Sequence, residues 1–119
     1  MSPRRRFPLV AAACIAVAAP SPAHAADTTA ARACKSITNP YAGTRYEGTD
    51  LRRIRATRVR CASARAFVRR AHRAALGMTP PPSGIRRFTY RGWRVTGNLR
   101  PSTDRYTAKR GRKKITWVF

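Results

Sequence analysis

The segment from Ala62 to Leu76 carries the clearest structural pattern in this chain, because its apolar residues recur at the spacing of one helix face. That face contains Ala64, Phe67, Val68, Ala71, Ala74 and Ala75. The opposite face contains Arg65, Arg69, Arg70, His72 and Arg73. Ser63 is suited to cap the start of the helix and Gly77 to end it. Since the apolar face is mostly alanine, the pattern predicts a helix that lies close against a sheet, with Phe67 as its main anchor.

The last third of the chain predicts two antiparallel hairpins, of which the first turns at Arg91-Gly92. A two-residue loop there pairs Tyr90 with Trp93 and Phe88 with Val95. All four side chains then lie on one face of the hairpin, because side chains alternate along a strand.

The second hairpin is expected to turn at Arg110-Gly111, which places Tyr106 opposite Ile115. Its last strand alternates apolar side chains toward the core, and these are Ile115, Trp117 and Phe119. Most aromatic residues of the chain are therefore expected to be core residues.

Two further segments precede these hairpins. Residues 51–60 place Ile54 and Val59 on opposite faces of an ideal strand, so either a bulge or a short strand flanked by loop is needed. Residues 79–84 contain three consecutive prolines, which exclude a helix and favour a stiff, extended connector.

Residues 1–25 have the composition of an export signal. Three arginines at 4–6 precede an apolar stretch at 7–19, and Ala23-His24-Ala25 is a small-x-small cleavage site. Because the stretch is shorter than the ~20 residues that a bilayer span needs, we expect cleavage near Ala25 and secretion rather than a permanent anchor. The arginine run partly matches the twin-arginine pattern, so both export routes remain open.

Two cysteines remain after this cleavage, Cys34 and Cys61, since Cys14 leaves with the signal. An even pair in a small exported domain predicts a disulfide. We expect no metal or cofactor, because two cysteines and His72 are too few ligands at the wrong spacing. The chain is thus expected to contain a flexible leader over 26–36 and a single α+β domain over 37–119. In that domain one amphipathic helix packs on a small antiparallel sheet of about four strands.

Residues for acid–base chemistry are scarce, because the acids are only Asp27, Glu47, Asp50 and Asp104. Glu47 and His72 have the residue types of a ribonuclease-like pair, but nothing in the sequence brings them together. The chain contains no glycine-rich phosphate loop, serine-nucleophile elbow or zinc motif. We therefore expect a protein without enzymatic activity, with a ribonuclease-like enzyme as the less favoured reading.

Basic residues dominate the composition: 26 Lys+Arg against 4 Asp+Glu give a net charge of +22. Such a surface attracts polyanions, and arginine suits phosphate and carboxylate oxygens. The candidate polyanion-binding residues lie on the predicted helix and around the last turn: Arg65, Arg69, Arg73, Lys109, Arg110, Arg112, Lys113 and Lys114. A basicity that merely reflects a genome rich in G and C is the alternative.

These features favour an exported, non-enzymatic protein that binds anionic polymers of the cell envelope. A secreted inhibitor or protein-binding module is the alternative, and a large exposed apolar patch would favour it. Sequence-specific DNA binding is not expected, because an exported protein does not meet the chromosome. The oligomeric state is left open.

The order of motifs also resembles one protein family. Val59-Arg60-Cys61-Ala62-Ser63-Ala64 has the form Val-x-Cys-x-x-Ala, and Gly92-Trp93 follows in a hairpin. In this respect the chain is similar to small exported actinobacterial proteins of unassigned function, over roughly Cys34 to Phe119. The resemblance implies export and an α+β fold, but no activity. Such relatives often carry a second cysteine pair in the C-terminal hairpins, and this chain lacks it, so its sheet must hold by packing.

Overall fold

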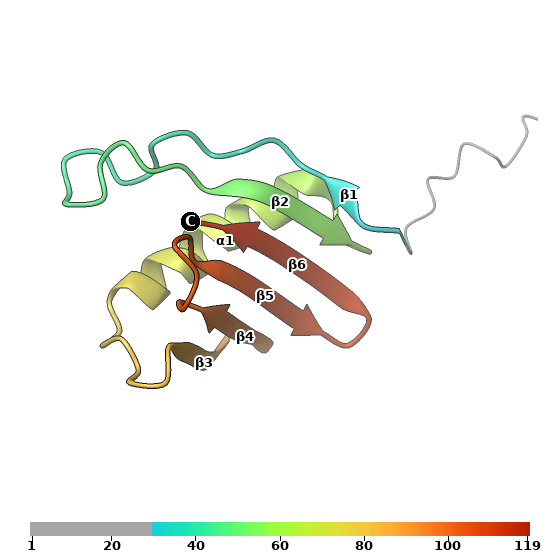
Figure 1. Cartoon of the computed structure of the whole chain (residues 1–119). Coiled ribbons are helices and arrows are strands. Elements are labelled where there is room, and N and C mark those ends of the chain that lie inside the picture. Colours follow the sequence, from blue (N-terminus) through green and yellow to red (C-terminus); the bar gives the residue numbers. More distant parts are fainter. Residues whose placement is uncertain (1–29) are drawn as a thin grey trace, which may run out of the picture.

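The computed structural model describes residues 30–119, so the export signal expected over 1–25 lies outside the described residues. All six strands form one antiparallel sheet in the order β1-β2-β6-β5-β4-β3, and the single helix packs against one side of it (Figure 1). This confirms the α+β fold, although about four strands were expected. The elements are β1 (Arg32–Ala33), β2 (Arg52–Thr57), α1 (Cys61–Leu76), β3 (Ile85–Tyr90), β4 (Trp93–Asn98), β5 (Arg105–Arg110) and β6 (Lys113–Val118).

The sheet contains two strands in addition to the four of the predicted hairpins, and β1 is the first of them. It pairs with β2 through Arg32 and Ala33 alone, and the Cys34 N–H then donates to the Ile54 carbonyl at 2.7 Å. The segment expected as a flexible leader, 26–36, therefore includes an edge strand. A strand of two residues is too short for side-chain alternation to reveal it in the sequence.

Strand β2 is the other additional strand, and it holds Ile54 and Ala56 in the core. The register against β6 shifts between Arg52 and Arg55, at a bulge where Arg53 has a φ of 49°. Val59 lies beyond the end of the strand. The short strand flanked by loop is therefore the alternative that accounts for Ile54 and Val59, because the bulge does not lie between these two residues.

Helix α1 begins one residue earlier than predicted and ends at the predicted position. Gly77 ends it, and its N–H donates to the Ala74 carbonyl at 3.2 Å. The expected cap by Ser63 is absent, because the N-cap position falls on Arg60 and no side chain caps the helix. The buried helix residues are Ala64, Val68, Ala71, His72 and Ala75.

The prediction that His72 shares the arginine face of the helix is wrong, because its side chain is 0% exposed. His72 follows Val68 by one turn and Ala64 by two, so it continues the buried stripe. Its Nδ1 accepts a hydrogen bond from the Trp117 Nε1 of β6 at 3.1 Å. A hydrogen-bond partner on the sheet, across the helix–sheet interface, therefore allows this histidine to be buried in the core.

The two hairpins differ in how well their register was predicted. The first has the expected pairs, Phe88 with Val95 and Tyr90 with Trp93. In the second, Tyr106 pairs with Trp117 rather than Ile115.

The turn explains the register of the second hairpin. Its loop is Gly111-Arg112 rather than Arg110-Gly111, and Gly111, with a φ of 58°, occupies the first loop position instead of the second. This register also stacks the rings of Tyr106 and Trp117, whose centroids are 5.2 Å apart at an interplanar angle of 4°.

Gly97 of β4 lies directly under the buried Tyr106 ring. A Cβ at this position would lie 2.5 Å from Tyr106 Cε1, and stacking on Trp117 prevents the ring from moving away. We expect Gly97→Ala to lower the free energy of unfolding by about 2 kcal/mol, because overpacking forces side chains from their rotamers. Urea unfolding tests this, with Thr96→Ala on the exposed side of the same strand as the control. Equal stability of both variants would contradict the packing described here.

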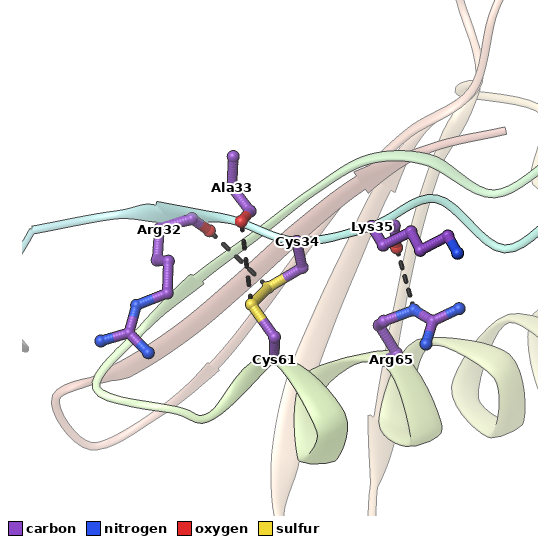
Figure 2. The surroundings of a disulfide bond; sticks show 6 residues. All are labelled: Arg32, Ala33, Cys34, Lys35, Cys61 and Arg65. Carbon is purple, nitrogen blue, oxygen red and sulfur yellow. Dashed lines mark hydrogen bonds between the residues drawn. A yellow bond between two sulfur atoms is a disulfide. The ribbon is translucent and has the colours of Figure 1, made fainter.

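The predicted disulfide between Cys34 and Cys61 is present, with Cα atoms 5.4 Å apart. It joins the segment after β1 to the first residue of α1 (Figure 2). One turn further along the helix, Arg65 Nε donates to the Lys35 carbonyl at 2.9 Å, as Figure 2 shows. The N-terminal segment is thus held to the helix by a covalent bond and a hydrogen bond. Within residues 30–119, no helix combines the length and apolar character needed to cross a bilayer.

Candidate functional site

The face of the sheet opposite α1 is uncovered, as Figure 1 shows. Side chains alternate across the sheet, so β4 places Trp93 and Val95 in the core and exposes Arg94 and Thr96. The same alternation holds in the other long strands. The composition of this open face is therefore set by every second strand residue.

A basic residue followed two positions later by threonine occurs on the open face of each six-residue strand. The five pairs are Arg55 and Thr57, Arg87 and Thr89, Arg94 and Thr96, Arg105 and Thr107, and Lys114 and Thr116. Of these five cations, sequence analysis singled out only Lys114 as a candidate, and it missed the repeated pattern. Because the spacing is two, the pattern is visible in the sequence once the strands are known.

Strand register brings three of these threonines into one row across the centre of the sheet. Thr107 pairs with Thr116 on one side and with Thr96 on the other. Arg55 and Arg87 close the two ends of the row. At about 4.8 Å between strands, the row spans roughly 19 Å from Arg55 to Arg87.

Further cations flank the threonine row. Lys114, Lys109 and Arg94 form the adjacent row of the same three strands, and Arg105 lies on the other side of Thr107. We call this surface the basic sheet face, and it consists of Thr96, Thr107 and Thr116 with Arg55, Arg87, Arg94, Arg105, Lys109 and Lys114. Of the strand residues on this open face, none is acidic. Three neutral hydroxyl groups thus lie inside a frame of six positive charges.

Two shallow hollows lie on the basic sheet face and share Thr107. The first has a volume of about 750 Å³ and is lined by Arg53, Arg55 and Arg105. The second has a volume of about 830 Å³ and is lined by Arg94 and Lys109. Both offer guanidinium or ammonium groups together with threonine hydroxyls, which are donors suited to phosphate oxygens.

The predicted basic cluster around the last turn is divided between two sides of the sheet. Lys109 and Lys114 pair with each other on the basic sheet face. Arg110 and Lys113 form the next pair, which alternation places on the helix side, although Arg110 also lines the second hollow of the basic sheet face. Arg112 lies in the turn itself.

The predicted helix stripe lies on the other layer of the molecule, since the exposed side of α1 is opposite the basic sheet face (Figure 1). Arg69 and Arg73 are exposed there. Arg65 is half-buried, and it donates to the Lys35 carbonyl at 2.9 Å and the Ser36 carbonyl at 3.4 Å. Part of the stripe therefore holds the N-terminal segment in place.

The three acids of the described residues all lie at the end of the sheet that is opposite the two hairpin turns. Glu47 and Asp50 precede β2, and Asp50 Oδ1 accepts a hydrogen bond from the Asn39 N–H at 2.8 Å. Asp104 precedes β5, where its N–H donates to the Phe119 carbonyl at 3.0 Å. Among residues 30–119, the other end, which we call the turn end, has cations without nearby acids. The charge of the described domain is therefore polarised along its strands.

Burial changes the chemistry of His72. Desolvation, assisted by the positive charge of Arg86, lowers the His72 pKa to about 3. The ring is therefore neutral at pH 7, with its proton on Nε2, because Nδ1 accepts the Trp117 hydrogen bond. Glu47 is exposed in the loop before β2, whereas His72 is enclosed by Tyr106 and Phe119. No cluster of potential metal ligands occurs within residues 30–119.

Arg86 is a buried residue that sequence analysis missed, because it sits among other arginines in β3. It is 7% exposed, and its Nη1 donates to the Tyr106 hydroxyl at 3.1 Å. Its Nη2 donates to the Met78 carbonyl at 3.3 Å, just after α1. Arg86 therefore ties the edge strand to the centre of the sheet and to the end of the helix.

Comparisons with known proteins yield no relative for this chain: no family model, curated protein or solved structure matches it.

Proposed function

We propose that this protein is an exported, non-enzymatic protein that binds anionic polymers of the cell envelope, and that the basic sheet face is its binding surface. The observation that carries this proposal is the row of three threonines framed by six cations across five strands. A flat, wide, basic surface suits a chain of repeating negative charges better than a single small ion.

The cations of the basic sheet face are close enough together to act jointly on one anionic chain. Neighbouring cations of the frame are one or two strands apart, at about 5–10 Å, which is within the Debye length of physiological salt. Arginine forks hold phosphate oxygens in pairs, and threonine hydroxyls supply further donors between them. The three described acids lie at the opposite end of the strands from Arg94, Lys109 and Lys114, so they do not compete for these three cations.

Export is part of the proposal and rests on the signal predicted over residues 1–25. The disulfide is consistent with it, because such bridges persist in oxidising compartments outside the cytoplasm. The resemblance to small exported actinobacterial proteins points in the same direction.

The other two readings of the sequence have less support. A protein-binding inhibitor is expected to expose an apolar patch, and Met78 is the one large hydrophobic residue exposed in the described part of the chain. A ribonuclease-like mechanism needs a histidine that exchanges protons with a substrate, and His72 is buried and neutral.

Binding of sodium polyphosphate at increasing salt tests the proposal. A ligand that contacts about six cations should lose affinity on the order of 10³-fold between 50 and 200 mM salt, as counterions compete. Arg94→Gln/Lys109→Gln/Lys114→Gln should weaken binding by more than about tenfold at low salt, and it should also reduce the salt dependence. Isothermal titration calorimetry measures both effects.

The matched control removes the same charge from the helix, as Arg69→Gln/Arg70→Gln/Arg73→Gln. It leaves Arg65 in place because that side chain holds the N-terminal segment. We expect this variant to bind polyphosphate within about threefold of the wild type, since only the general field is reduced. Equal losses in the two variants would mean that net charge, and no particular face, attracts the polymer. Absence of binding at low salt would show that the basicity is incidental.

A further inference from the structure

A second basic site lies at the turn end, on the helix side of the sheet. A hollow of about 370 Å³ opens there between α1 and the strand turns. Its apolar lining consists of Val59, Phe67, Trp93 and Ile115, and its charged lining consists of Arg58, Arg60, Arg110 and Lys113. Ser63 also lines it. This volume falls within the range of roughly 300–1,000 Å³ that small-molecule sites occupy.

The apolar part of the hollow is a packed surface that other residues keep in place. The rings of Phe67 and Trp93 are 4.8 Å apart, and Phe67 also contacts Trp117 in the core. Phe67 remains half-buried and Trp93 is 8% exposed, whereas Ile115 is fully buried. An apolar group of a ligand would therefore meet a floor formed mainly by Phe67, with only a small part of Trp93 exposed beside it.

The cations around this floor come from two separate segments. Arg58 and Arg60 lie between β2 and α1, while Arg110 and Lys113 flank the turn between β5 and β6. The Arg110 guanidinium group also lies beside the turn between β3 and β4. Its carbon would be 3.7 Å from a Cβ atom built on Gly92. The fold therefore brings together two pairs of positive charges that are far apart in the sequence.

We propose that this hollow binds an organic phosphate, with the phosphate among the four cations and its apolar group on the Phe67–Trp93 floor. The charge complementarity selects an anion with several oxygens, because guanidinium groups bind such anions through paired hydrogen bonds. The aromatic floor selects an anion that carries an apolar group. This inference does not rest on the proposed function, because the hollow is on the other side of the sheet from the basic sheet face.

Arg58 combines an unfavourable backbone conformation with a guanidinium group that lines the hollow. Its φ is 58°, a region that residues other than glycine rarely occupy. Arg58→Gly separates the two effects: it should raise the melting temperature by a few degrees and weaken ligand binding.

Titration with phenyl phosphate, followed by the indole N–H signals in an NMR spectrum, tests the proposal on the disulfide-bonded protein. The chain contains two tryptophans, and the indole N–H of Trp117 is bonded to His72 in the core. We expect the Trp93 signal to shift and saturate while the Trp117 signal changes little. Phenyl phosphate should bind at least about tenfold more tightly than inorganic phosphate, which lacks the apolar group, and than phenol, which lacks the charge.

Variants locate the site. Arg58→Gly and Lys113→Gln should each weaken phenyl phosphate binding by about fivefold or more, through loss of charge-assisted hydrogen bonds. Arg94→Gln/Lys109→Gln/Lys114→Gln should leave it within about twofold, because those side chains are on the other face. The proposal is overturned by an unmoved Trp93 signal, by inorganic phosphate that binds as tightly, or by a larger effect of the sheet-face variant. None of these results bears on polyphosphate binding by the basic sheet face, so the two proposals can fail separately.

Discussion

Acidification from pH 7 to pH 3 is expected to lower the free energy of unfolding by on the order of 4 kcal/mol, because His72 is buried in its neutral form. Its pKa is lowered from 6.5 to about 3 in the folded protein, by desolvation first and by Arg86 second. Between these two values the unfolded chain binds the proton and the folded chain does not. The contribution of His72 is therefore complete above pH 6.5 and is lost as the pH falls through 3.

Asp104 offsets part of this loss. Burial raises its pKa above 3.8, so the folded state binds this proton more readily than the unfolded state does. That contribution favours folding as the pH falls. Because Asp104 is only partly buried, we expect the effect of His72 to dominate.

Urea unfolding at several pH values between 7 and 3 measures the effect. The control is His72→Gln, which removes the titrating group while its amide oxygen can still accept the Trp117 N–H. We expect the variant to be less stable than the wild type at pH 7 and less sensitive to pH. If both proteins lose stability in parallel on acidification, another group is responsible and the account of His72 is wrong.

Removal of the Cys34–Cys61 disulfide is the change with the second largest expected effect. The bridge closes a loop with a sequence separation of 27 residues. In the chain-entropy model its loss costs about 3 kcal/mol, which in a domain of this size lowers the melting temperature by on the order of 10 °C. The segment around β1 also loses its covalent link to α1. We therefore expect the pairing of β1 with β2 to loosen first.

Thermal unfolding of the oxidised protein, the reduced protein and Cys34→Ser/Cys61→Ser measures the loss. The reduced protein and the double variant should agree within a few degrees, since both lack the same constraint. A thiol assay on the non-reduced protein is the direct control. Two free thiols in that assay, or an unchanged melting temperature after reduction, would contradict a stabilising bridge.

Local sequence patterns correctly predicted the elements whose conformation depends on residues close together in the chain. The apolar spacing over 62–76 placed the helix within one residue at its start, and Arg91-Gly92 predicted the first hairpin with its pairs. The disulfide followed from the count of cysteines left after the signal. In each case the information lies within a few residues or in a single pair, so no long-range packing is needed to read it.

Residues whose position depends on distant partners were the ones that local patterns misplaced. His72 looked like part of an arginine face, and the Trp117 side chain 45 residues away makes a buried site for it. Arg86 was not singled out from the sequence, and its hydrogen bonds to the Tyr106 hydroxyl and the Met78 carbonyl hold it in the core. Strand β1 exists only because β2 and the disulfide hold it.

The charge of this protein follows from its sequence alone, and so does the alternation that exposes a basic residue and a threonine on each long strand. Which of these residues become neighbours was decided by the order β1-β2-β6-β5-β4-β3 and by the strand register. A shift of the β5–β6 register by two residues, as the sequence suggested, would keep every side chain on its face and yet move Thr116 away from Thr107. The threonine row, its frame of cations and the hollow at the turn end therefore exist only in the folded sheet, because the hydrogen bonds between its strands set their alignment.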